Sequence, residues 1–276
     1  FLSQHKLNRD GMIVALGGGV VGDLAGFVAG TWMRGVPWVN CPTTMEADVD
    51  ACLGGKTAVN LAGGKNLVGV FHHPMVVAID PNCLCTLPER DVRAGLAESI
   101  KHALLQSSQE VEWLETNAPK IVALEPETLT ELIQRNLRFK GQIVSEDPYE
   151  QLDRRIILNF GHTIGHAIEA CAEGTLRHGE CVSLGMVAAC RISLRAGLIG
   201  SDEVDRIRNL LVKFGLPTKL EISLDREKVQ EALQLDKKNT GRKKRFVLLK
   251  GVGTPVIRDD IPANWSIEAY DSLLAP

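Results

Sequence analysis

Short apolar runs separated by glycine-rich turns dominate the first third of the sequence. Residues 12–16 are continuously apolar and precede three glycines, which is typical of a parallel strand buried on both faces. We predict further strands over 36–41 and 75–79, and a helix over 23–33 with Leu24, Phe27 and Val28 on one face. This order of strand, helix and strand predicts a parallel α/β sheet.

Helical periodicity replaces this alternation after Pro88. The sequence predicts helices over 89–105, 109–118, 126–144, 161–171, 181–196 and 201–214. Residues 245–250 and 254–257 are predicted to pair as short strands. The fold class is therefore α/β plus all-α, with a partial parallel-sheet domain over residues 1–87 and a mainly α-helical domain over residues 88–276.

Composition and charge narrow the class of protein. The chain has 276 residues, 45% of them apolar and 24% charged, which is ordinary for a globular protein with a substantial core. A net charge of −3 excludes a generally basic nucleic-acid binder, and no apolar run is long enough to span a membrane. The seven cysteines contain no CxxC pair, which favours a reducing, cytoplasmic location over a disulfide framework.

Residues 17–22 fit the pattern G-x-G-x-x-G between a predicted strand and a predicted helix. Glycines let the backbone approach a pyrophosphate, and the N-terminus of the helix supplies free N–H groups. A dinucleotide fingerprint would also place an acidic residue at the end of the next strand, where this chain has Pro42, Thr43 and Thr44. The bare pattern favours a tight turn without a ligand, whereas its position favours a phosphate-cradling turn of another arrangement.

Two further clusters combine paired glycines with a lysine. Lys56 follows Gly54-Gly55 close to Asp50, and Lys65 follows Gly63-Gly64 beside Asn66. Each cluster alone is typical of an exposed turn with a solvated lysine. Together with the first glycine loop, they favour a surface that binds anionic oxygens.

Three of the seven histidines lie within seventeen residues. His162 and His166 are spaced i, i+4 and share a face of the predicted helix, and His178 precedes the next helix. Glu98 lies in an apolar helical segment and needs a partner if it is buried. Two or three histidines with one glutamate fit a catalytic zinc site, although an isolated H-x-x-x-H is more often structural. The other histidines are expected to be structural or to have no evident partner: His5, His72, His73 and His102.

Motifs along nearly the whole chain resemble those of 3-dehydroquinate synthase, a sugar phosphate cyclase. They run in order as GGGVVGD at 17–23, MRG at 33–35, PTT at 42–44, VD at 49–50, GGKTAVN at 54–60, GKNL at 64–67, GLAESIK at 95–101, NFGHTIGHAIE at 159–169, HGE at 178–180 and DKK at 236–238. The resemblance implies a lyase of the shikimate pathway that converts the anionic sugar acid phosphate DAHP to 3-dehydroquinate and phosphate. It also implies catalytic NAD and one divalent metal, zinc or cobalt, held by Glu98, His162 and His178.

The resemblance further implies the residues that contact substrate and NAD, and a homodimer to which Arg34 contributes across the subunit interface. The implied substrate contacts are polar or charged: Arg34, Asp50, Lys56, Lys65, Asn66, Lys101, Lys140, Arg155, Asn159, His166 and Lys237 or Lys238. The implied NAD contacts are Gly18, Gly19, Val20, Val21, Gly22, Asp23, Thr43, Thr44, Lys56, Lys65, Cys83, Leu84, Cys85 and Thr86.

The chain departs from the family pattern at Glu46 and Asp48, where the family has apolar or neutral residues, and in the loop 147–153. We expect the two carboxylates to be solvated or to alter substrate choice. The upstream strands of the family's nucleotide-binding domain have no counterpart here, so we expect weak binding of NAD by residues 1–276 alone. The alternatives are a valiolone-type cyclase, a metal-dependent polyol dehydrogenase, and a fragment that is inactive without those strands.

Overall fold

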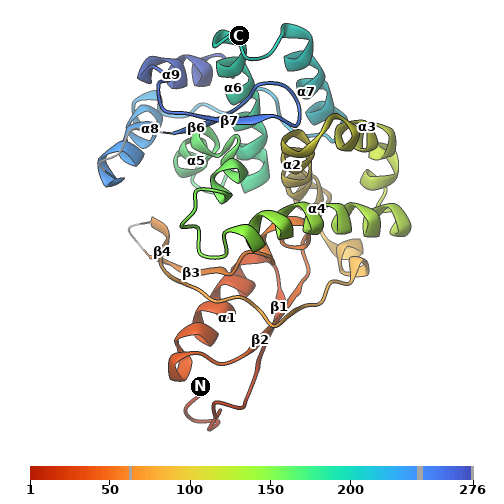
Figure 1. Cartoon of the computed structure of the whole chain (residues 1–276), viewed down its shortest axis with the longest axis vertical. Helices are drawn as coiled ribbons and strands as arrows, with labels where there is room; N and C mark the ends of the chain where they lie inside the picture. The colour runs from red at the N-terminus through yellow and green to blue at the C-terminus, as the bar shows by residue number, and fades with distance from the viewer. Residues whose placement is uncertain (62–63, 241–244, 275–276) are drawn as a thin grey trace.

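A small parallel sheet with one covering helix forms the N-terminal part of the chain, as the computed structural model shows (Figure 1). The structure describes residues 1–61, 64–240 and 245–274. For residues 64–65 and 235–240 it describes only the backbone. The three strands pair in the order β1-β2-β5, and helix α1 packs on one face. Their bounds are β1 Ile13–Gly17, α1 Gly19–Thr31, β2 Trp38–Pro42 and β5 Val76–Val77.

Strand β1 is not buried on both faces, and that expectation was wrong. Its side chains alternate, with Ala15 only 2% exposed against α1 while Val14 and Leu16 are 60% and 70% exposed. Among the described residues, β1 lies at the edge of its sheet and α1 covers a single face, which leaves these side chains exposed. Continuous apolar character therefore predicted the strand but not its surroundings.

The glycine–lysine clusters form a strand pair rather than isolated turns. Strand β3 (Lys56–Leu61) pairs antiparallel with β4 (Gly64–Phe71), with an irregular register between Val59 and Leu61. Thr57 is buried between the pair and α1, and its hydroxyl donates a hydrogen bond to the carbonyl oxygen of Val70 at 2.8 Å. Most other side chains of the pair are exposed, so the sequence shows no clear alternation there.

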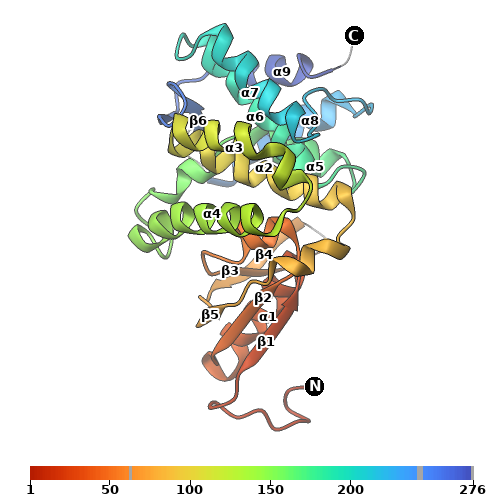
Figure 2. The same cartoon turned by 90° about the vertical axis from the view of Figure 1, so that its right-hand side faces the viewer.

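Helices make up most of the chain after residue 88, as predicted (Figure 2). The six predicted helices are present within a few residues of their expected bounds, and two more follow them. The helices are α2 Glu89–Gln106, α3 Ser108–Val122, α4 Pro126–Glu146, α5 His162–Cys171, α6 His178–Arg195, α7 Ser201–Lys213, α8 Arg226–Thr240 and α9 Ala263–Asp271. The predicted C-terminal strands also form, with β6 (Phe246–Leu249) antiparallel to β7 (Pro255–Arg258).

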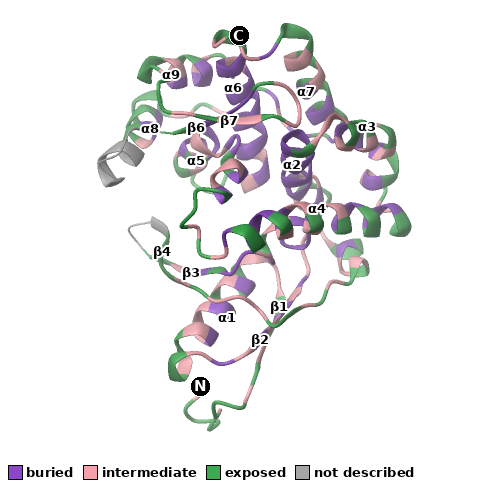
Figure 3. Ribbon diagram, in the orientation of Figure 1, coloured by how far each residue is buried: buried purple, intermediate pink, exposed green. Residues whose placement is uncertain are grey.

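One large hydrophobic core joins these helices to segments that precede residue 88 (Figure 3). Met45 and Val49 near the π-helical turn η2 (Ala47–Ala51), and Leu84 in the 3₁₀ segment η3 (Pro81–Thr86), are all fully buried in this core. Packing at one end of α2 depends on two glycines, because a Cβ on Gly95 would lie 2.4 Å from the amide nitrogen of Glu46, and one on Gly179 would lie 1.7 Å from the carbonyl oxygen of Ala94. These close approaches bring η2 and the start of α6 against α2.

The cysteines and the lengths of the helices bear on the class of protein. All seven cysteines are free thiols. Within the described ranges, the chain has no helix that combines the length and the apolar character needed to cross a membrane.

Candidate active site

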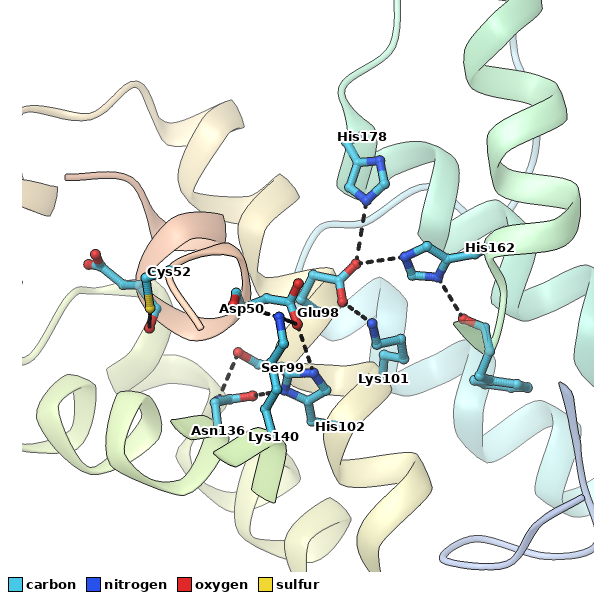
Figure 4. A network of polar contacts seen from close by, with 12 residues as sticks. Asp50, Cys52, Glu98, Ser99, Lys101, His102, Asn136, Lys140, His162 and His178 are labelled. Atoms are coloured by element: carbon cyan, nitrogen blue, oxygen red, sulfur yellow. Dashed lines mark hydrogen bonds and ion pairs between the residues drawn. The ribbon is translucent and has the colours of Figure 1, made fainter. Parts of the chain in front are cut away.

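A buried carboxylate and two imidazoles meet where α2, α5 and α6 come together (Figure 4). Glu98 on α2 is 1% exposed, and its Oε1 lies 3.5 Å from Nε2 of His162 and 3.5 Å from Nε2 of His178. His162 and His178 are the first residues of α5 and α6, so both rings project from helix starts. The start of α6 packs against α2, and α5 packs against α6. The structure therefore brings together the three residues that the resemblance implies as metal ligands.

The second ring nitrogen of each histidine fixes which atom faces Glu98. Nδ1 of His162 lies 3.1 Å from the carbonyl oxygen of Phe160, and Nδ1 of His178 lies 3.0 Å from Oε2 of Glu169. A carbonyl or carboxylate oxygen only accepts, so each Nδ1 is the donor. With His162 neutral, its Nε2 directs a lone pair toward this carboxylate oxygen. Burial opposes charge on His178, but Glu169 and Glu98 outweigh it and raise the pKa of His178 to about 11, so the site attracts positive charge, either as a proton on this ring or as a metal ion.

These atoms fit a divalent metal ion. The two 3.5 Å separations exceed normal hydrogen-bond length, and zinc bonds to nitrogen and oxygen at roughly 2.0–2.2 Å. Burial, reinforced by the positive charge of Lys101, lowers the pKa of His162 to about 3, which keeps this ring neutral. Burial opposes charge on Glu98 too, but Lys101 outweighs it and holds the pKa of this carboxyl below its usual range. A neutral imidazole beside an ionised carboxylate is a typical donor set for zinc or cobalt.

His166 joins the same cluster from the next turn of α5. The rings of His162 and His166 are 5.0 Å apart between centroids, and those of His166 and His178 are 5.8 Å apart. One ring nitrogen from each of the three histidines lies within 4.8 Å of the others. His166 is more exposed than its neighbours, which places it at the open side of the cluster. The expected role of His166 as a substrate contact stays a prediction.

Two buried lysines lie beside the carboxylates. Lys101 is 2% exposed and forms a short ion pair with Oε2 of Glu98. Nζ of Lys140, on α4, lies 2.9 Å from Oδ1 of Asp50 and donates to the backbone oxygen of Asp50 at 2.6 Å. Burial opposes charge on Asp50, but Lys140 and then Lys101 outweigh it and hold its pKa well below the usual range. Although Asp50, Glu98 and His102 could by spacing hold a cation, the two ammonium groups already supply the positive charge there.

Sequence reasoning missed a histidine in this cluster. We expected His102 to have no evident partner, and this was wrong. Its Nε2 lies 3.1 Å from Oδ1 of Asp50, and its Nδ1 lies 2.7 Å from Oδ1 of Asn136. The partners lie 52 and 34 positions away, in η2 and α4, so no local motif could have indicated them. The position of His102 one helical turn after Glu98 was the one available clue.

The other residues expected to contact substrate lie in several positions around this cluster. Arg155 is buried and donates from one terminal nitrogen to the carbonyl oxygens of Gly54 and Pro148, at 2.9 and 3.1 Å. Lys56 is half-exposed and pairs with Glu150 at 2.5 Å. The remaining residues of this group lie at exposed positions or outside the described side chains: Arg34, Asn66 and Asn159 are exposed, and the side chains of Lys65, Lys237 and Lys238 are among those not described.

The residues expected to contact NAD adjoin one another at one end of the sheet. Gly18 caps the start of α1, and a Cβ there would lie 2.8 Å from Cγ2 of Thr44. The amide of Thr43 donates to the carbonyl oxygen of Gly17 at 3.0 Å. Burial raises the pKa of Asp23, in the first turns of α1, to about 6 against the opposing charge of Lys140. The glycine loop and the Pro42-Thr43-Thr44 turn thus form one continuous surface.

The other residues expected to contact NAD differ in how far they are exposed to solvent. Val20 and Val21 are exposed at the start of α1, and Gly19 and Gly22 lie beside them in the same helix. In η3, Cys85 and Thr86 are exposed and Cys83 is partly buried. Leu84 is fully buried in the core, so only its backbone can reach a ligand.

Of the two carboxylates that depart from the family pattern, Asp48 is not solvated, contrary to one of our expectations, whereas Glu46 is partly exposed. Asp48 is 0% exposed, and neither carboxylate oxygen has a hydrogen-bond partner within the described part of the chain. Burial, with the nearby charge of Asp80, raises the pKa of Asp48 to about 7. Burial also raises the pKa of Glu46, whose charge interacts with His178 and Glu98.

Comparisons with known proteins identify the family of this chain. Residues 1–94 match a family model described as 3-dehydroquinate synthase N-terminal, and residues 95–239 match one described as 3-dehydroquinate synthase C-terminal. A 3-dehydroquinate synthase from Nitrosospira multiformis is 44% identical over 95% of this chain and 71% of its own length. One from Thermoanaerobacter pseudethanolicus is 49% identical over 91% of this chain and 70% of its own length.

Solved structures of related cyclases share the fold. A 2-epi-5-epi-valiolone synthase from Streptomyces hygroscopicus subsp. jinggangensis, with NAD⁺ and Zn²⁺ bound, has a TM-score of 0.91 at 28% identity, covering 99% of this chain and 76% of its own. A 2-deoxy-scyllo-inosose synthase in complex with carbaglucose-6-phosphate, NAD⁺ and Co²⁺ has a TM-score of 0.90 at 33% identity, covering 99% and 77%. Because two family models cover most of the chain and relatives are more than 40% identical to it, this chain belongs to the 3-dehydroquinate synthase family.

Proposed function

We propose that this chain is a 3-dehydroquinate synthase, which converts DAHP to 3-dehydroquinate and phosphate. The observation that carries the proposal is the convergence of Nε2 of His162 and Nε2 of His178 on one oxygen of Glu98, with Lys101 and Lys140 buried beside them. This combination joins a metal site to a concentration of positive charge. A substrate that has vicinal hydroxyls, a carboxylate and a phosphate needs both.

Glu98, His162 and His178 would hold the metal, for which zinc and cobalt both suit the donor set. A bound divalent ion would engage the substrate hydroxyls and favour loss of the proton from the one that is oxidised. Glu169 and the carbonyl oxygen of Phe160 hold the Nδ1–H groups of the two histidines, and this keeps Nε2 of each ring available. At the metal site, the chain therefore contributes by orienting the Nε2 atoms that would bind the metal.

Bound NAD supplies the acceptor and later the donor of the hydride. We propose that its pyrophosphate lies against the glycine loop at the start of α1, where the helix terminus favours negative charge. This assignment divides the chain into a nucleotide-binding part over 1–87 and a metal and substrate part over 88–276. Asp50 in η2 lies where the two parts meet, because its partners Lys140 and His102 are on α4 and α2.

Basic residues around the metal site would bind the anionic groups of the substrate. We propose contacts from Lys101, Lys140 and Arg155, and from His166 at the open side of the histidine cluster. For Arg155, only one of the guanidinium nitrogens donates to a backbone carbonyl, and its Nε has no partner among the described residues. The guanidinium therefore retains donors for a carboxylate.

We further propose a cytoplasmic homodimer. The location is supported by seven free thiols, which are typical of a reducing compartment. The dimer is supported by Arg34, which is exposed, has a positive φ of 69° and is presented on the turn after α1, where a neighbouring subunit could use it. Light scattering should give twice the mass of the chain.

The test of the proposed function is turnover by the purified chain with NAD, zinc and DAHP. We expect release of inorganic phosphate and formation of 3-dehydroquinate in equal amounts, with NAD not consumed. The parallel assay with sedoheptulose 7-phosphate, which lacks the carboxylate, should give little product. Turnover of sedoheptulose 7-phosphate in preference to DAHP would instead assign the chain to the valiolone-type cyclases.

A further inference from the structure

A line of polar contacts runs from Asn136 on α4 through His102 on α2 to the Asp50 carboxylate (Figure 4). Asn136 on α4 donates from its amide nitrogen to the carbonyl oxygen of Leu132 at 2.8 Å and faces the hydroxyl of Ser99 at 3.1 Å. These two contacts fix which end of the Asn136 amide is oxygen. That oxygen faces Nδ1 of His102 at 2.7 Å.

The orientation of Asn136 sets the role of each ring nitrogen of His102. An amide oxygen only accepts, so Nδ1 of His102 donates to Asn136. On the opposite side of the ring, Nε2 lies 3.1 Å from Oδ1 of Asp50, which is an ion-pair contact when the ring is protonated. A single rigid ring, held by Asn136 at Nδ1, therefore joins Asn136 to the Asp50 carboxylate.

The line is buried everywhere except at its Asp50 end. His102 is 2% exposed, and Ser99 and Asn136 are 2% and 4% exposed. The side chain of Asp50 is 21% exposed, and its ligand atom lies within 4.8 Å of that of Glu98. The end of the line thus opens beside the proposed metal centre, and the rest has no contact with solvent.

We propose that His102 is a positioning residue, which holds the carboxylate of Asp50 in the orientation that the reacting sugar phosphate requires. This inference rests on the proposed function, because it concerns the same site. Asp50 belongs to an irregular π-helical turn, and its second partner, Lys140, has a flexible stem. A planar ring anchored at Nδ1 holds Nε2 at a fixed position beside the carboxylate, which the flexible stem of a lysine cannot do.

The geometry also explains why positioning matters at Asp50. Its partners are on α2 and α4, while Asp50 itself follows the Thr43-Thr44 turn that adjoins the glycine loop. The His102–Asp50 contact therefore fixes the nucleotide-binding part relative to the metal part. Because hydride transfer depends strongly on the alignment of cofactor and substrate, a small displacement of Asp50 should slow turnover.

The experiment is a double-mutant cycle on turnover of DAHP by the metal-loaded enzyme. His102→Phe keeps an aromatic ring but removes the donor, and we expect kcat and kcat/KM to fall together by about 10- to 100-fold. His102→Gln retains an N–H donor near the position of Nε2 and should recover part of that loss. In an Asp50→Ala background, His102→Phe should have little further effect, because the carboxylate that it positions is gone.

Controls separate this role from a general loss of structure. The matched variant is His72→Phe, since His72 faces the carbonyl oxygen of Val36 away from the site. It should leave turnover unchanged, and thermal unfolding and zinc content should show that His102→Phe is folded and loaded. Additive losses in the cycle, or equal losses in the Phe and Gln variants, would refute the positioning role. A wild-type chain that binds both zinc and NAD but does not turn over DAHP would refute the proposed function itself, and the positioning role with it.

Discussion

The buried carboxylate of Asp48 makes the stability of this protein depend on pH in an unusual direction. Asp48 is 0% exposed with no hydrogen-bond partner for either oxygen among the described residues, and burial raises its pKa from 3.8 to about 7. Between these two values the folded chain retains a proton that the unfolded chain releases. The free energy of unfolding should therefore decrease as pH rises from about 4 to about 7.

The Asp48→Asn variant removes this titration and keeps the shape of the side chain. The full pKa difference corresponds to about 4 kcal/mol at high pH, at about 1.4 kcal/mol per unit, and roughly 2–3 kcal/mol of this should develop between pH 5 and pH 8. We therefore expect the variant to gain about 2–3 kcal/mol relative to the wild type over that interval, measured by urea unfolding at pH 5, 6.5 and 8. Asp205→Asn, on the exposed surface of α7, is the matched control and should follow the wild type. If the Asp48→Asn and wild-type stabilities change in parallel with pH, Asp48 is not held in its neutral form, and the argument from burial is wrong.

Three further predictions follow from the site. Glu98→Ala and His178→Ala should each lose tightly bound zinc by elemental analysis, while His166→Ala should keep zinc and lose turnover; unchanged metal in the first two variants would contradict the ligand assignment. Arg155→Ala should cost about 1.5–3 kcal/mol more in kcat/KM with DAHP than with an analogue that lacks the carboxylate, because a charged hydrogen bond is lost only where its partner exists; equal losses on both substrates would exclude the carboxylate contact. Gly179→Ala should lower the free energy of unfolding by about 1–3 kcal/mol in urea titrations, because the added Cβ would lie 1.7 Å from the carbonyl oxygen of Ala94 and must separate α6 from α2; a stability equal to the wild type would show that this contact relaxes freely.

The sequence alone determined the local elements and part of the chemistry. The helices from α2 to α7 were predictable because their apolar residues recur at helical spacing on faces that pack into one core. His162 and His166 share a face for the same geometric reason, since both belong to one helix. The strands β1 and β2 followed from short apolar runs that end in turn residues.

Only the tertiary structure decided which of these elements meet. Glu98 lies 64 and 80 positions before His162 and His178, and their approach depends on the packing of α6 against α2 and of α5 against α6. The His102–Asp50 contact likewise joins two segments, and the hydrophobic pattern of neither one indicates the other as its partner. Periodicity reports the direction of a side chain within its own helix, whereas the partner across the interface depends on how helices cross.

Burial was also decided at the tertiary level. The apolar run of β1 and the carboxylate of Asp48 both have surroundings opposite to those expected from residue type, with Leu16 70% exposed and Asp48 0% exposed. The strand pair β3–β4 escaped prediction because its side chains are mostly exposed and show no alternation. A residue's polarity gives the free energy of burying it, but the position of its segment relative to the core decides whether that burial occurs.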